Sequence, residues 1–169
     1  MLPLRRGDIV LRRFRSSDAE AFHGIRSDPE VGRYQSWDPL DRNGALRAVT
    51  AMETEPPFPR GGWWQVAIAR PGDDELVGDL GLHLAADGTE LELGITLART
   101  AQGQGLAPQA IRAAADLVFA ETPARRIVLI TDARNAAMLA VLARLGLTQV
   151  DTLHDQGFPE PVFHLTRST

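Results

Sequence analysis

Three apolar segments in the middle of the chain are separated by turn-forming residues. The segments are Trp63–Ala69, Leu76–Leu84 and Glu90–Ala98, and each has the length and composition of a strand. Pro71-Gly72-Asp73-Asp74 lies between the first two and Ala86-Asp87-Gly88 between the last two, and such residues favour tight turns. The pattern predicts three consecutive strands that form an antiparallel meander.

The second half of the chain predicts alternating helices and strands. Arg126–Thr131 is almost entirely apolar, which is typical of a strand covered on both faces. A helix is predicted over Asn135–Leu145, because Gly146 is a typical residue just beyond a helix C-terminus. Another is predicted from Gly105 to about Ala120, with an apolar stripe of Leu106, Ala110, Ala113, Ala114, Leu117 and Val118.

The ends of the chain complete the predicted elements. A strand is expected at Ile9–Phe14, and Ser17-Asp18-Ala19-Glu20 begins a helix that Asp28-Pro29 ends. The remaining elements are a helix over residues 41–54 and closing strands over about 147–153 and 161–166. Strands and helices that alternate after an antiparallel meander predict a mixed sheet in an α/β protein.

The composition removes several kinds of chemistry. The 169 residues include no cysteine, which excludes disulfides, thiolate catalysis and zinc sites built on cysteine. All 18 basic residues are arginine, which excludes a Walker-type phosphate loop and lysine Schiff bases. The 4 histidines lack the spacing of metal ligands, so no metal site is predicted.

Charge and hydropathy limit the partners. A formal net charge of −4 argues against a nucleic-acid partner. No window approaches the roughly 18 consecutive apolar residues of a membrane span, and the start MLPLRRGDIVL lacks the apolar run of a signal peptide. We therefore expect a cytoplasmic monomer or homodimer with neither a membrane nor a nucleic-acid partner.

The stretch RTAQGQGLAPQA, residues 99–110, joins a predicted strand to the long predicted helix. Glycine has no Cβ, so Gly103 and Gly105 allow a ligand to approach the backbone closely. The start of the following helix presents unpaired N–H groups and the positive end of its dipole. Both features favour an anion, most often a phosphate.

Two familiar phosphate-binding patterns do not fit this loop. A Walker loop requires lysine, and the dinucleotide pattern G-x-G-x-x-G needs a third glycine where Pro108 stands. The loop does match the pattern Q/R-x-x-G-x-G/A of coenzyme A-dependent acetyltransferases, over Gln102-Gly103-Gln104-Gly105-Leu106-Ala107. Gly-rich loops before helices are common, so these six residues need support from the rest of the chain.

Motifs along nearly the whole chain supply that support. They resemble those of the GNAT superfamily of N-acetyltransferases and, within it, of the RimJ/RimL-like branch. The matching motifs are Asp28–Val31 with Arg33, Tyr34 and Trp37; Val77–Gly81; Glu92–Gly94; and Asn135, which stands eleven residues before Gly146.

The resemblance implies an α/β fold, with a mixed, mostly antiparallel sheet flanked by helices. It implies one N-acetyltransferase domain over residues 1–169, with a core at about 9–167, and central strands that splay apart at Gly94 to admit acetyl-CoA. A simple β-bulge would also account for this glycine. The residues expected to bind the cofactor are Ile95, Thr96, Leu97, Gln102, Gly103, Gln104, Gly105, Leu106, Ala107, Asn135 and Met138.

Acetylation of an amine requires a group that accepts the ammonium proton. Alternation along Glu90–Leu97 places Glu92 on the face opposite the strand's four apolar side chains, beside the expected splay. Glu92 also matches the strand glutamate of the family and is the first candidate for the base. His83 on the neighbouring strand is the second, and a purely structural role stays open for each.

The chain departs from the family at the position of the acid. Many relatives carry a serine or a tyrosine that serves the leaving sulfur, where this chain has Met138 and Leu142, so no acid is assigned. Aromatic residues stand in or near segments that line the acceptor site in this fold, although aromatic side chains also fill protein cores. They are Tyr34, Trp37 and Trp64, which are the expected substrate contacts, together with Phe58 and Trp63.

These features predict an acetyl-CoA-dependent N-acetyltransferase that acetylates a primary amine by direct attack in a ternary complex. The acceptor is a protein N-terminus or a small molecule, because the branch includes enzymes for both. A non-catalytic acyl-CoA-binding domain with a regulatory role is the alternative.

Overall fold

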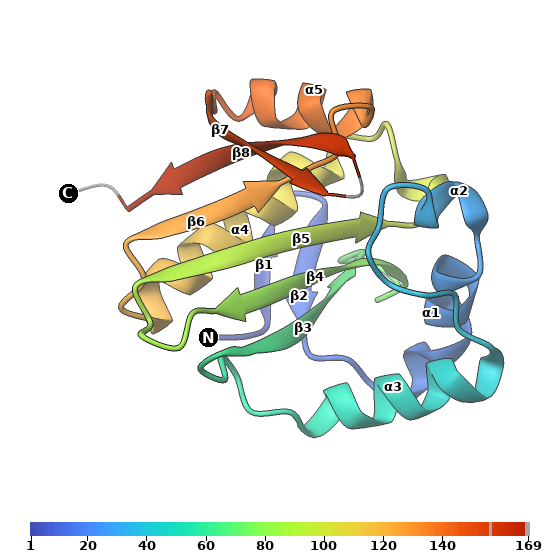
Figure 1. Ribbon diagram of the computed structural model, residues 1–169. Coiled ribbons are helices and arrows are strands. Elements are labelled where there is room, and N and C mark those ends of the chain that lie inside the picture. Colours follow the sequence, from blue (N-terminus) through green and yellow to red (C-terminus); the bar gives the residue numbers. More distant parts are fainter. Residues whose placement is uncertain (156, 168–169) are drawn as a thin grey trace.

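The computed structural model describes residues 1–155 and 157–167, which form one eight-stranded sheet with helices on both sides (Figure 1). The strand order is β1-β2-β3-β4-β5-β6-β8-β7, and only the pair β5–β6 within these residues is parallel. The predicted mixed, mostly antiparallel sheet is therefore confirmed. The strands are β1 (Leu4–Arg6), β2 (Ile9–Arg12), β3 (Gly62–Ala69), β4 (Leu76–Leu84), β5 (Glu90–Leu97), β6 (Arg126–Ile130), β7 (Gln149–Asp155) and β8 (Phe158–Thr166).

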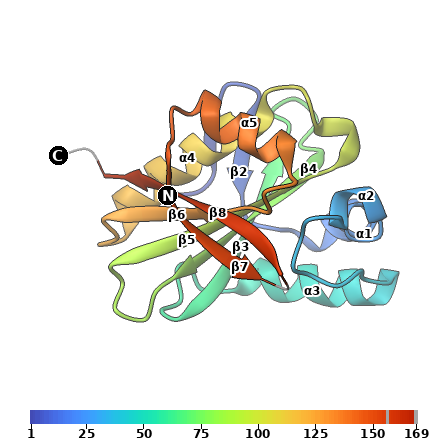
Figure 2. The same cartoon turned by 45° about the horizontal axis from the view of Figure 1, so that its top comes forward.

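The helices cover the two faces of the sheet unequally. α4 (Leu106–Glu121) packs on one face against β1, β2 and β5, and it also contacts α5 (Ala136–Arg144). On the other face, α1 (Ala19–Arg26) packs against α3 (Arg42–Thr54) and β4, and the short α2 (Pro29–Gly32) follows α1. Figure 1 and Figure 2 show α1 and α3 at one corner of this face, so most of β5 is left uncovered there.

Two hydrophobic cores hold the helices to the sheet. The predicted stripe of α4 forms the centre of the larger core, and each of its residues is at most 2% exposed. The smaller core joins α1 and α3 to β3, with the rings of Phe14 and Phe22 edge to face at 5.4 Å. Burial of one such aromatic side chain contributes roughly 1.5–3 kcal/mol. The larger core therefore holds α4 to the sheet, and the smaller core holds α1 and α3 to it.

The N-terminal elements are shorter and more numerous than the sequence suggests. Gly7, with φ of +54°, turns the chain between β1 and β2, so the strand expected over Ile9–Phe14 has a hairpin partner. That strand ends at Arg12, two residues earlier than expected. Asp28-Pro29 does end the first helix, but a second helix begins at once. Proline suits a first helical turn, because the N–H it lacks would have no helical acceptor there.

The two closing strands form a hairpin, in which β7 is shifted towards the C-terminus relative to the predicted strand and β8 begins earlier than predicted. Proline cannot donate a ladder hydrogen bond, which obscures the start of β8 in the sequence. The carbonyls of Pro159 and Pro161 accept hydrogen bonds from the N–H groups of Ala133 and Thr131, beyond the end of β6. The missing N–H groups therefore face a loop rather than a strand, and β8 tolerates both prolines.

The parallel pair β5–β6 is joined only at its start. Glu90–Glu92 lie opposite Arg126–Val128, and beyond this point the two strands diverge. β5 stays paired with β4 from Leu91 to Leu97 without a shift of register. The splay expected at Gly94 is confirmed, and the alternative of a bulge between β4 and β5 is wrong.

Candidate functional site

The edge of β5 that faces the splay carries main-chain groups without a strand partner. Ala98 donates its N–H to the carbonyl of Val77 at 2.9 Å, and alternate residues of an antiparallel ladder point to opposite sides. The carbonyls of Ile95 and Leu97 therefore point away from β4. They accept hydrogen bonds from side-chain amides instead, from Gln35 at 3.3 Å and Gln102 at 3.1 Å.

A cavity of about 410 Å³ lies along this open edge. α2 and the loop after it form one wall, β5 the second, and the start of α4 and one side of α5 the remaining walls. The volume falls within the range of ligand pockets, roughly 300–1,000 Å³. The predicted cofactor residues that line the cavity are Ile95, Thr96, Leu97, Gln102, Gly103, Gly105, Leu106, Ala107, Asn135 and Met138.

The glycine loop forms the end of the cavity that suits an anion. Gly103 and Gly105 have φ of +74° and +73°, and a Cβ on either residue would meet no atom within 4 Å. The backbone is thus open to a ligand. The first N–H groups of α4, beginning at Leu106, have no acceptor within the helix. Arg144 also lines the cavity.

These residues fit coenzyme A. Main-chain donors at a helix N-terminus suit its pyrophosphate. The unpaired edge of β5 suits the amide groups of its pantetheine arm, because an extended ligand can pair with such an edge as a strand does. Leu97, Met138 and Val141 supply apolar walls beside that edge.

Gln104 is placed differently from its predicted neighbours. Its side chain accepts a hydrogen bond from Arg70 at 2.6 Å and donates one to the carbonyl of Thr100 at 2.7 Å. The residue does not line the cavity. Gln104 therefore supports the shape of the loop from behind.

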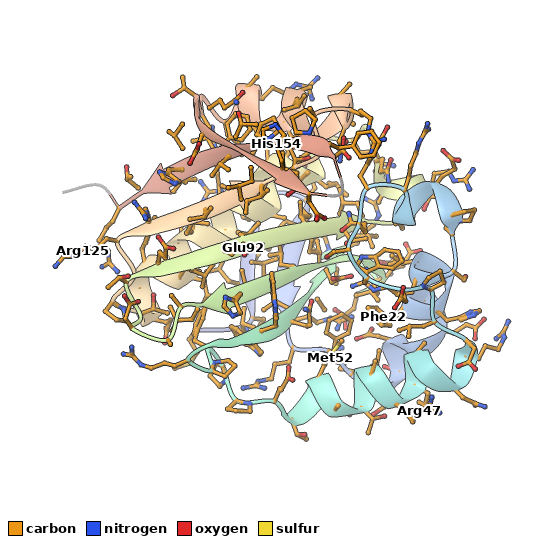
Figure 3. The ribbon with its side chains drawn as sticks, viewed as in Figure 1. Phe22, Arg47, Met52, Glu92, Arg125 and His154 are labelled. Atoms are coloured by element: carbon orange, nitrogen blue, oxygen red, sulfur yellow. The ribbon has the colours of Figure 1, made fainter. Side chains whose placement is uncertain are left out.

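Glu92 and His83 lie directly opposite each other on β5 and β4. Figure 3 labels Glu92 near the middle of the sheet, on the strand that the helices leave uncovered. Trp63 is next in this row on β3, and its ring centroid lies 5.2 Å from that of His83. Both candidate bases thus share one surface beside the splay.

Two glycines lie next to this row, and the sheet surface is open at one of them. Gly81 and Gly94 lie opposite each other, two residues along the strands from His83 and Glu92 and closer to the cavity. A Cβ on Gly94 would meet no atom within 4 Å, whereas one on Gly81 would meet the Trp63 ring at 3.0 Å. An amine can therefore approach the splay across Gly94 from the face that carries Glu92.

Carboxylates of the final two strands and of the loop after β6 lie near this face. Burial raises the pKa of Glu160 on β8, and the charges of Asp155, Asp132 and Glu92 raise it further. A hydrogen bond from Arg134 lowers the pKa of Asp132 to about 2. Arg134 offsets the charge of Asp132, so Glu92, Asp155 and Glu160 are the carboxylates that favour a positively charged acceptor at this surface.

The predicted aromatic contacts are placed in three different environments. Tyr34 lines the cavity, with the guanidinium carbons of Arg33 and Arg134 at 5.5 and 5.9 Å from its ring centroid. Trp37 stacks on Arg26, whose guanidinium carbon lies 4.4 Å from the ring centroid. Trp64 is 2% exposed and packs in the core on the α4 side, so it faces away from Glu92.

The residues in place of the family's acid also differ in position. Met138 lines the cavity, whereas Leu142 is fully buried in the larger core. Asn135 accepts the N–H of Met138 at 3.1 Å and thereby caps α5. Leu142 therefore belongs to the packing of α5.

Two polar features were missed by the sequence analysis. One is Gln35, whose amide reaches the open edge of β5 from the loop after α2. The other is a buried ion pair between Arg26 of α1 and Asp79 of β4, with nitrogen and oxygen 2.8 Å apart. Burial raises the pKa of Asp79, although Arg26 acts in the opposite direction. Alternation along the strand places Asp79 on the same face as His83, but this pattern does not indicate that Arg26 is its partner.

The splayed sheet, the glycine loop and the cavity between them define the class of acetyltransferase folds. A family model described as an acetyltransferase (GNAT) domain matches residues 8–148. The chain belongs to this GNAT acetyltransferase family.

Solved structures show the same fold. A GNAT-family acetyltransferase from Bacillus anthracis is 18% identical, with a TM-score of 0.84 over 96% of this chain and 97% of that one. RimL, a ribosomal L7/L12 alpha-N-protein acetyltransferase, is 17% identical, with a TM-score of 0.77 over 98% and 93%. A spermidine N-acetyltransferase from Vibrio cholerae, in complex with CoA and spermine, is 15% identical, with a TM-score of 0.77 over 94% and 95%.

The structure also bears on membranes and metals. Over residues 1–155 and 157–167, no helix has the length and apolar character that a membrane span requires. The same residues contain no group of three or more His, Asp or Glu side chains that could hold a metal ion.

Proposed function

We propose that this protein is an acetyl-CoA-dependent N-acetyltransferase of the RimJ/RimL-like branch that acetylates a primary amine. The observation that carries the proposal is the open edge of β5, which continues directly into the glycine loop before α4. A thioester bound along this edge would present its carbonyl beside Gly94. Residues 1–169 would act as one transferase domain, with its core at about 9–167, in the cytoplasm, as a monomer or homodimer.

Glu92 is the proposed base. Its carboxylate takes a proton from the acceptor ammonium, directly or through water, and such a base contributes typically 10²–10⁴-fold. The amine nitrogen then attacks the thioester carbon directly in the ternary complex. The N–H of Ile95, which has no strand partner, donates to the thioester oxygen as negative charge develops there. His83, opposite Glu92, is the second candidate for the base.

The sulfur would leave as a thiolate, and the second proton that the nitrogen loses as the amide forms would pass to solvent. A thiol has a pKa near 8.5, taking cysteine as the reference, so protonation is not obligatory at neutral pH. Tyr34 brings a hydroxyl to the cavity wall where Met138 and Leu142 offer none. We assign it to substrate binding together with Trp37, and we replace Trp64 in this role by Trp63, which lies on the face of Glu92.

The acceptor is a protein N-terminus or a small-molecule amine. RimL is named as an enzyme of the first kind and the spermidine acetyltransferase as one of the second, and both share the fold. An acetyl-CoA assay of thiol release over a panel of N-terminal peptides and small amines tests the proposal. Turnover with any member supports a transferase. Tight acetyl-CoA binding without thiol release from any member would favour the non-catalytic binding domain.

A further inference from the structure

A second cavity, of about 500 Å³, lies at the far end of α4 from the glycine loop. It is enclosed by the C-terminal turns of α4, the ends of β3 and β4, the loop before β3 and the first residues of the chain. It shares no described lining residue with the cavity at the splay. Its lining residues are Met1, Leu2, Arg13, Pro57, Phe58, Arg60, Trp64, Leu84, Leu117, Glu121, Thr122 and Pro123.

The walls of this far cavity suit an aromatic body. Phe58 and Trp64 meet edge to face with ring centroids 4.8 Å apart, and Leu2, Leu84 and Leu117 add aliphatic surface. Phe58 has φ of +51°, a left-handed backbone conformation that is rare for a bulky residue. Such strain persists where the surroundings enforce it and gathers at binding sites.

A polar group without a partner also lies in this wall. Trp64 is 2% exposed, and its indole N–H is buried without a hydrogen-bond acceptor among the described residues. Buried donors are normally paired. The nitrogen is itself inaccessible, so a ligand in the cavity can contact only other atoms of the Trp64 ring.

The charge at the cavity is positive. The Arg13 guanidinium lies 5.9 Å from the Trp64 ring centroid and donates to the carbonyl of Glu55 at 2.7 Å. Neither Arg13 nor Arg60 has a carboxylate within 4.0 Å among residues 1–155 and 157–167. The lining carboxylate, Glu121, is paired with the N-terminal amine at 2.7 Å. Arg60 donates to the carbonyl of Ala86 at 3.4 Å, and its charge contributes to the lowered pKa of Asp87. Because neither arginine has a carboxylate in direct contact, both keep donors for an anionic group.

We propose that the far cavity binds a small organic monocarboxylate with an aromatic body, independently of coenzyme A. The ring lies against Phe58 and Trp64, and the carboxylate faces Arg13 and Arg60. The volume suits a ligand with two fused rings. This inference does not depend on the proposed transferase activity, because it concerns a separate site.

Two-dimensional NMR of the ¹⁵N-labelled protein tests the proposal with 2-naphthoate as the probe. The three tryptophan indole signals are assigned with Trp37→Phe and Trp63→Phe, and the titration is run with saturating coenzyme A. We expect the Trp64 indole signal to shift saturably with 2-naphthoate. The neutral analogue 2-naphthamide should bind at least tenfold more weakly.

Variants locate the carboxylate. Arg13→Gln with Arg60→Gln should weaken 2-naphthoate binding at least tenfold, whereas the charge-matched control Arg47→Gln on α3, labelled in Figure 3, should leave it unchanged. Melting temperatures confirm that each variant is folded. A Trp64 signal that does not shift, equal binding of the amide, or loss of 2-naphthoate binding when coenzyme A is added would each overturn the proposal.

Discussion

Arg99 holds Asp28 in a two-point salt bridge, with Nε 3.0 Å from Oδ2 and Nη2 2.8 Å from Oδ1. Asp28 also accepts the N–H of Glu30 and so caps α2. The hydrogen bond from Arg99 is the main cause of the lowered pKa of Asp28. Because Arg99 precedes the glycine loop and α2 forms the facing wall, this one pair joins two walls of the cavity at the splay.

Asp28→Asn should therefore weaken the binding of acetyl-CoA. Asparagine keeps the cap of α2 but cannot form the ion pair with Arg99. We expect KM for acetyl-CoA to rise roughly twofold to fivefold, which corresponds to the free energy of one exposed ion pair. The value of kcat should stay nearly constant. Steady-state kinetics measures both constants, with Arg42→Gln, which removes the exposed pair with Glu20, as the control. An unchanged KM would show that the two walls do not depend on this pair.

Gly105→Val should impair the glycine loop. Gly105 has φ of +73°, which valine strongly disfavours, and a new Cβ would project into open space. We expect acetyl-CoA to bind at least tenfold more weakly, about 1.4 kcal/mol. Calorimetry on the folded variant measures the affinity. Gly146→Val is the matched control, because Gly146 has φ of +75° and similarly open surroundings but lies beyond α5. Equal affinities for acetyl-CoA in the two variants would contradict the role of the loop.

Glu92→Gln should separate binding from chemistry. The carboxylate acts on the amine alone, so kcat should fall by roughly 10²–10⁴ while acetyl-CoA affinity is unchanged. Glu90→Gln, two residues earlier on the same strand face, removes a carboxylate that already pairs with Arg126 and serves as the control. Near-normal turnover of the Glu92 variant would transfer the role to His83, which His83→Gln then tests.

The buried pair Arg26–Asp79 should show strong coupling. Arg26→Met leaves the Asp79 carboxylate buried without its cation, which costs about 3–5 kcal/mol of unfolding free energy. The double variant Arg26→Met with Asp79→Leu should recover most of this loss, since no uncompensated charge remains. Urea unfolding of the single and double variants measures the coupling. Additive losses in the double variant would mean that the two residues act separately.

Asp132 should make the free energy of unfolding depend on pH in the acid range. Its pKa is lowered from 3.8 to about 2, chiefly by the Arg134 hydrogen bond. A carboxylate with a lowered folded pKa stabilises the protein above its unfolded value and loses this effect as pH falls through the folded value. The difference in unfolding free energy between the wild type and Asp132→Asn should thus shrink between about pH 4 and pH 2. A constant difference over this range would argue against the lowered pKa.

Patterns local in sequence were sufficient for most of the fold. The stripe from Leu106 to Val118 sets the buried face of α4, and Asn135 and Gly146 mark the ends of α5. The glycine loop could be found for the same reason, because Gly103 and Gly105 need only their own backbone conformation. What the sequence could not show depends on side chains brought together from distant segments. Gln35 reaches Ile95, and Arg26 reaches Asp79, only once α1 and α2 lie on the sheet.

The tryptophans show the same limit within two adjacent positions. Trp63 and Trp64 are neighbours in a strand, so one must face each side of the sheet. Because both residues are tryptophan, the sequence alone does not say which of them lies on the face of the sheet that the acceptor approaches. The register of β3 with β4 decides it, because Trp63 lies opposite His83.

The amides of Gln35 and Gln102 have a consequence for solubility. A strand edge left open inside a splayed sheet resembles the exposed edges through which proteins aggregate, by pairing with strands of other molecules. Here the carbonyls of Ile95 and Leu97 are already occupied by the two glutamines. A foreign strand that offered its own N–H groups would have to displace them. The glutamines thus protect the edge from pairing with a foreign strand. The neighbouring N–H groups stay free for an extended ligand that offers hydrogen-bond acceptors.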